Sequence, residues 1–213
     1  MATISSVGIR QSYSLIKKAY EKVGRKPVTT ASDLKLLMPV SSNKTSYSFP
    51  VLVGDDPSNY PEAILLNRAD AFTATEIGIF IGKKYGVNDT TYDLFSYPNS
   101  SEFGSDADIF KTLFNHATMD ITINNVQYLQ NYSLSRLRTV GQTQYNSTAG
   151  TQDQFDATFG FYPMVPTLQL SGTSKVNITI NLPESLQSPM SGQYVIVVAL
   201  RGFLSLGASN LNK

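Results

Sequence analysis

The apolar pattern near the end of the chain limits its possible folds more than any other feature. Apolar residues occupy every second position from Val176 to Leu182, with Asn or Thr between them, and Pro183 follows directly. This period of two predicts a β-strand with one buried face, which the proline then ends. Residues 194–200 are continuously apolar, which predicts a strand that is covered on both faces. Both segments indicate strands packed in layers.

Shorter segments with the same period occur earlier in the chain. Residues 47–53 and 75–81 show alternation, and residues 119–130 have the pattern of a hairpin whose turn is Asn124-Asn125. Asparagine tolerates positive φ, which a tight hairpin turn requires. The strands are short and follow no regular alternation with helices. We therefore expect an all-β fold, a single antiparallel β-sandwich of two sheets.

Two helices are expected beside the strands. Residues 12–23 place apolar side chains on one stripe and lysines on the other, which predicts an amphipathic N-terminal helix. Residues 106–115 carry apolar side chains at helical spacing behind capping candidates, which predicts one short interior helix. Because the period changes to two near residue 45, we divide the chain into a basic N-terminal arm and helix, residues 1–44, and a β-sandwich domain, residues 45–213.

Positive charge is concentrated at the start of the chain. The first 26 residues hold six basic side chains and one acidic one, whereas the rest of the chain holds eleven basic and fifteen acidic ones. The six basic residues are Arg10, Lys17, Lys18, Lys22, Arg25 and Lys26. Such an arm can contact nucleic acid, an internal membrane or neighbouring subunits. The alternative is that the helix covers one end of its own β domain.

A long polar stretch is expected to form an exposed loop. Residues 142–156 contain no Leu, Ile, Val or Met. A loop of this length in a compact domain is usually functional or mobile. We expect it to form an outward face or a contact that orders on assembly, and a simple connector is the alternative. The expected contact residues are Gln142, Tyr145, Gln152 and Phe155.

The cysteine and histidine content argues against most enzyme sites. The chain has no cysteine, which excludes disulfides, thiolate zinc sites and a cysteine nucleophile. Its one histidine, His116, falls at the end of the predicted interior helix, where the helix dipole favours it. A site built from several histidines is therefore excluded, and we expect no catalytic residue, cofactor or small-molecule substrate.

Two groups of carboxylates leave alternatives open. Glu102, Asp106 and Asp108 lie close together in the sequence, as do Asp55 and Asp56. Paired carboxylates can bind calcium or serve as the acid and base of a glycoside hydrolase. Aspartates are also ordinary helix caps and turn residues, which accounts for both groups. We therefore expect no metal site, with calcium binding and glycoside hydrolysis as the alternatives.

Composition bears on where such a protein works. Charged residues make up 15% of the chain, below the roughly 25% typical of soluble domains. A surface rich in Ser, Thr, Asn and Gln suits a protein that other subunits cover, because burying charge is costly. Neither an apolar signal-peptide core nor a run of about 18 apolar residues is present, so we expect synthesis in a cytoplasm.

In layout, with a basic arm, a strand-rich body, a crossover helix and a long polar loop, the chain resembles the jelly-roll capsid proteins of small tailless icosahedral bacteriophages. The resemblance implies that the β-sandwich is a jelly roll. The same resemblance implies a virion structural protein, a capsid or minor shell subunit whose partners are copies of itself and other virion proteins. It also implies that residues 1–26 face the particle interior. The chain is too short for two full barrels. The alternatives are a carbohydrate-binding or receptor-binding adhesion module and, more weakly, a glycoside hydrolase.

Overall fold

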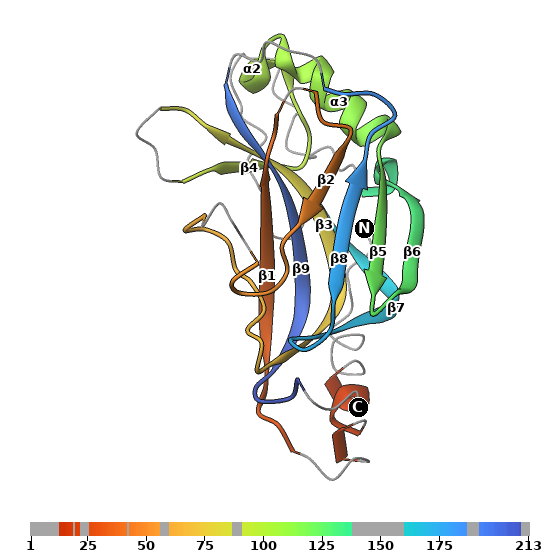
Figure 1. Cartoon of the computed structure of the whole chain (residues 1–213). Coiled ribbons are helices and arrows are strands. Elements are labelled where there is room, and N and C mark those ends of the chain that lie inside the picture. Colours follow the sequence, from red (N-terminus) through yellow and green to blue (C-terminus); the bar gives the residue numbers. More distant parts are fainter. Residues whose placement is uncertain are drawn as a thin grey trace.

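The computed structural model describes residues 13–18, 20–21, 26–41, 43–55, 60–86, 91–137, 160–186 and 192–209. In this part of the chain, nine strands and a few short helices make a mostly β structure (Figure 1). The strands are β1 (Thr29–Pro39), β2 (Ser46–Phe49), β3 (Ala71–Lys84), β4 (Asp93–Phe95), β5 (Thr118–Ile123), β6 (Val126–Ser133), β7 (Phe161–Ser171), β8 (Val176–Asn181) and β9 (Gln193–Ser205). The helices are α2 (Ser100–Phe103), α3 (Asp106–His116) and the 3₁₀-helix η1 (Leu134–Leu137).

The strands form two antiparallel sheets. One has the order β1-β9-β3-β4, and β7 also pairs with β3, farther along the same strand. The other has the order β2-β8-β5-β6. Most connections between consecutive strands cross from one sheet to the other, while β5 and β6 form a hairpin within one sheet. The chain therefore passes repeatedly between the two sheets, which enclose a shared interior.

A single large hydrophobic core lies between the two sheets. Leu36 and Ile79 of the first sheet belong to the same buried cluster as Ile121 and Ile180 of the second. Along β8 the inward Ile178 and Ile180 are buried and the outward side chains are not, as the alternation in its sequence predicts. Period-two strands thus supply one buried face to each layer.

The five-stranded sheet is also covered on its outer face. Leu37, Phe80, Val195 and Val197 form a second buried cluster, against which Tyr60 and other side chains from the connecting segments pack. Residues 194–198 of β9 are buried without interruption. The prediction of a strand covered on both faces is therefore confirmed for β9.

The hairpin turn has the predicted geometry. Asn124 and Asn125 connect β5 to β6 with φ of 50° and 67°. Such positive φ values are accessible to asparagine at small cost. The Asn124 side chain also accepts a hydrogen bond from the backbone N–H of Lys175, 2.9 Å away. The turn is therefore tied to the start of β8.

The strands begin earlier than the sequence pattern predicts. Residues 29–39, which fall within the expected arm, form β1 and pair with β9 over their whole length. Leu34 and Leu36 face the main core, whereas Leu37 belongs to the outer cluster. Because β1 is covered on both faces near its end, its sequence lacks the simple alternation that marks β8.

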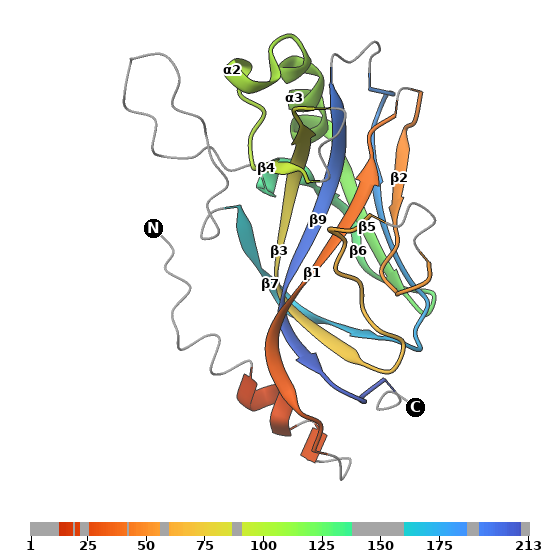
Figure 2. The ribbon, with the colours of Figure 1, turned by 90° about the vertical axis from the view of Figure 1, so that its left-hand side faces the viewer.

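The two ends of the molecule carry different helices. The helices α2 and α3 lie at one end of the sheets, and α3 occupies the stretch where the interior helix is expected (Figure 1). Residues 13–18 and 20–21 are also helical and are called the N-terminal helix below. This helix lies at the opposite end, near the start of β1 (Figure 2).

Candidate functional site

The N-terminal helix docks on the five-stranded sheet through a narrow apolar stripe. Ile16 and Tyr20 are buried in a small cluster with Ala71 of β3, Phe203 of β9 and Ala208. The Tyr13 ring also lies against the Phe203 ring, with 5.6 Å between centroids. The helix therefore covers one end of its own β domain with one face and leaves the other face open.

The open face of this helix carries the positive charge. Lys17 and Lys18 are exposed on the helix, and Lys26 is exposed just before β1. Within the described residues none of the three forms an ion pair at 4 Å or less. The amino groups are therefore available to an external polyanion. Within the same residues no helix is long and apolar enough to cross a membrane.

Several expected contact residues lie outside the described residues. They are Arg10, Lys22 and Arg25 of the arm and Gln142, Tyr145, Gln152 and Phe155 of the polar loop. Of the six basic residues expected in the arm, the structure describes Lys17, Lys18 and Lys26. We call these three residues the basic end.

The outer face of the four-stranded sheet is a second candidate surface, which sequence analysis did not single out. Its four strands contain a single charged residue, Asp120. The Asp120 carboxylate accepts hydrogen bonds from Asn181 Nδ2 and from the Asn131 backbone N–H, both at 2.7 Å. Ser46 and Ser48 donate to Asn181 and Asn177 on the neighbouring strand. We call this array of hydroxyls and amides around one carboxylate the neutral face.

A partner that covers the neutral face pays a low desolvation free energy. Its side chains satisfy one another by hydrogen bonds between strands, so a partner need not desolvate isolated charges. Depletion of charge is also the compositional feature of the central part of protein interfaces. The sequence signal for this surface is that Ser, Thr and Asn recur at the outward positions of several of its strands.

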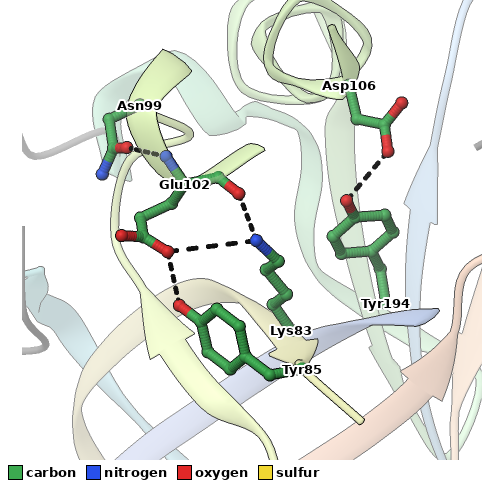
Figure 3. A network of polar contacts seen from close by, with 6 residues as sticks. All are labelled: Lys83, Tyr85, Asn99, Glu102, Asp106 and Tyr194. Atoms are coloured by element: carbon green, nitrogen blue, oxygen red, sulfur yellow. Dashed lines mark hydrogen bonds and ion pairs between the residues drawn. The ribbon is translucent and has the colours of Figure 1, made fainter. Parts of the chain in front are cut away.

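The acidic cluster near α2 has structural partners (Figure 3). Asn99 caps α2 by accepting the Glu102 backbone N–H at 2.8 Å. The Glu102 carboxylate accepts the Tyr85 hydroxyl at 2.5 Å and lies 3.9 Å from the Lys83 amino group. Lys83 also donates to the Glu102 carbonyl oxygen. The pKa of Tyr85 is raised above its ordinary value, most strongly by burial and next by the hydrogen bond to Glu102.

Asp106 and Asp108 occupy different environments although both lie in the first turn of α3. Asp106 is 2% exposed and accepts the Tyr194 hydroxyl at 2.8 Å (Figure 3). The Asp108 side chain is 84% exposed and pairs with Lys111. The sequence cluster therefore divides into a buried anchor, a surface ion pair and the Glu102 network. The described residues contain no group of three acidic or histidine side chains placed to hold a metal ion.

The remaining candidates for chemistry are dispersed. Asp55 pairs with Arg68 at 2.6 Å on the surface, while Asp56 lies outside the described residues. His116 is exposed at the last position of α3, where the helix dipole favours a positive charge. These groups are not brought together with Glu102 or Asp106 by any contact in the described residues.

Three charged residues, Asp33, Glu76 and Arg201, lie close together on the five-stranded sheet. They are beside a bulge in β3, where its pairing with β9 shifts register between Ala74 and Glu76. Arg201 lies 3.9 Å from Asp33 and stacks on the Phe161 ring, with 3.6 Å to the centroid. Glu76 is paired in register with Arg201. Burial raises the pKa of Glu76 above its ordinary value of 4.5, Arg201 opposes the shift, and Asp33 adds to it.

This trio predicts a pH-dependent effect of Glu76→Gln. Because the pKa of Glu76 is raised on folding, ionisation of the carboxyl destabilises the folded state at neutral pH. We expect the glutamine variant to gain less than about 1 kcal/mol at pH 7, since the site is partly exposed. The gain should shrink as the pH falls through the folded pKa and vanish below the ordinary value. Urea unfolding at several pH values measures it, and a constant difference at every pH would contradict the assignment.

No protein family model matches the chain. No curated protein sequence matches it either.

Proposed function

We propose that the domain is a β-sandwich of the jelly-roll type. The support is a nested order of strand pairing, in which β1 pairs with β9, β2 with β8, β3 with β7 and β5 with β6. In a jelly roll, strand pairs are nested in this way along one long antiparallel hairpin. The hairpin is rolled up so that successive pairs fall alternately in the two sheets. The short strand β4 is an addition beside β7 on the edge of one sheet.

We further propose that the protein is a virion structural protein, a capsid or minor shell subunit. The nested pairing is the observation that carries this proposal, because jelly rolls recur in viral shells. Folds do not define functions, so the proposal also draws on two surfaces. The neutral face suits contact with other subunits, and the basic end suits contact with a polyanion.

The proposed partners follow from these surfaces. Copies of the same chain and other virion proteins would cover the neutral face. The basic end would face the particle interior, against nucleic acid or the anionic surface of an internal membrane. Many repeated weak contacts would then hold the shell, rather than one strong site. No catalytic step is part of this proposal.

A glycan-binding or receptor-binding module is the second candidate. The hydroxyl and amide groups of the neutral face are the observation that favours it, because sugars are bound through such groups. An adhesion module would bind glycans as a monomer or small oligomer, whereas a shell subunit would assemble. The carboxylates near α2 and α3 have separate partners, which gives the hydrolase alternative little support.

Charge reversal at the basic end tests the proposed role of the arm. We expect Lys17→Glu with Lys18→Glu to lower the fraction of full-length protein that assembles with added DNA by about tenfold at low salt, because both side chains are exposed on the helix and their contacts with DNA phosphates would be lost. Sedimentation velocity measures the assembled fraction. Charge reversal is preferable to truncation, since removal of the helix would expose Ala71 and Phe203.

The matched control for this pair is Lys44→Glu with Lys111→Glu. It changes the net charge equally at residues outside the N-terminal helix. We expect the control variant to assemble nearly as the wild type does. Equal loss in both variants would attribute the effect to net charge and contradict a specific role for the basic end.

A further inference from the structure

The two sheets meet at an open seam between β6 and β7. In the described part of the chain each of these strands has one partner, β5 for β6 and β3 for β7, so each is an edge strand. A cavity of about 230 Å³ lies between them. Edge strands present unpaired N–H and C=O groups that can accept a further strand. The seam therefore combines a hollow with two strand edges that have no second strand partner in the described residues, and Pro163 and Pro166 of β7 carry no N–H.

The floor of the seam is the hydrophobic core itself. Ile77 and Leu168 line the cavity and are each only 2% exposed. Leu129, Tyr132 and Met164 line its walls and pack against the same core. An apolar side chain that entered the cavity would therefore contact core residues directly.

The β7 side of the seam is irregular in a way that keeps it open. Pro163 pairs with Glu76 and Leu168 pairs with Ala74, so residues 164–167 face only Thr75 of β3. Val165, in this bulge, is 91% exposed. Across the seam, Tyr128 of β6 is 52% exposed and also lines the cavity. Bulges of this kind are over-represented at sheet edges and next to active sites.

Among the described residues, a single charged side chain lines the cavity. Arg136 of η1 lies over the Tyr132 ring, with 5.8 Å to its centroid. Within the described residues Arg136 forms no ion pair at 4 Å or less. An apolar groove with an unpaired guanidinium is complementary to a ligand that has apolar groups and a carboxylate.

We propose that the seam between β6 and β7 binds an extended peptide segment of another polypeptide, with an apolar side chain in the cavity and an acidic side chain at Arg136. The free strand edges favour a peptide over a lipid, because only a peptide backbone can pair with them. Apolar pockets beside a strand edge select alternate side chains of such a peptide. This binding site is distinct from the basic end and from the neutral face.

Two synthetic peptides test this inference on the full-length protein. Both are short, labelled with fluorescein and built of alternating valine and threonine, and they differ only in a central glutamate or a central lysine. We expect fluorescence anisotropy to show the glutamate peptide binding about three- to tenfold more tightly than the lysine peptide at low salt. Arg136→Glu should reverse this preference. Val165→Asp, at the exposed bulge, should weaken both peptides.

Controls distinguish the seam from general electrostatics. Arg68→Glu makes the same charge change at an exposed arginine that does not line the cavity, and it should leave the preference unchanged. Equal effects of Arg68→Glu and Arg136→Glu would overturn the proposal. So would equal affinity for the two peptides, or displacement by decanoate in the absence of any peptide preference, which would make the seam a lipid site.

Discussion

Gly202→Val is expected to destabilise the fold more than any other single change considered, by about 3 kcal/mol or more. A Cβ at Gly202 would overlap the backbone carbonyl oxygen of Thr73 on the neighbouring strand. A backbone atom in the centre of a sheet cannot move aside as a flexible side chain can. The overlap falls where the pairing of β3 with β9 shifts register at Thr75, so no alternative pairing is available without losing the bulge.

Urea unfolding followed by circular dichroism measures the effect. Gly202→Ala supplies a second variant if the valine protein does not accumulate, and it meets the same carbonyl oxygen. Gln193→Val is the matched control, because it adds a β-branched side chain at an exposed position of the same strand. A free energy of unfolding for Gly202→Ala within 0.5 kcal/mol of the wild type, roughly the spread of surface substitutions, would contradict the described packing.

Asp106→Ala is expected to cost about 2–3 kcal/mol, the second largest effect. The change removes a nearly fully buried hydrogen bond to Tyr194. Tyr194 also stacks on Phe103 and meets the edge of Phe110, so the bond joins α2 and α3 to β9. We therefore expect the helices to detach from the end of the sheets before global unfolding.

A double-mutant cycle isolates this hydrogen bond. Asp106→Ala and Tyr194→Phe should be coupled by about 1 kcal/mol or more. Asp108→Ala is the matched control in the same helical turn, and its exposed ion pair with Lys111 should contribute less than about 0.5 kcal/mol. Equal losses for Asp106→Ala and Asp108→Ala would show that helix charge, rather than the buried bond, accounts for the effect.

Local patterns in the sequence predicted the parts of the fold that depend on local chemistry. The period of two gave β8, the continuous apolar run gave β9, and Asn124-Asn125 gave the hairpin turn. Each signal follows from one buried face, two buried faces or positive φ. The sequence pattern did not predict β1, because both of its faces become covered near its end, and prolines interrupt the pattern of β7.

The candidate surfaces depend on contacts that sequence patterns do not contain. Burial of Asp106 and exposure of Asp108 follow from Tyr194, which is 88 positions away from Asp106. The neutral face arises because polar positions of β2, β5 and β8 become neighbours only after the sheet forms. The charge of the arm was visible in the sequence, but the docking of Ile16 beside Phe203 was one of two open interpretations.

The most direct test of a shell subunit is the mass of the purified full-length protein in solution. Light scattering over a range of protein and salt concentrations measures it. The proposal predicts large closed assemblies, and added DNA should increase their amount at low salt, where its contact with the basic end is not screened. A monomer or small oligomer under every condition would contradict assembly by this chain alone and would shift support to a glycan-binding or receptor-binding module.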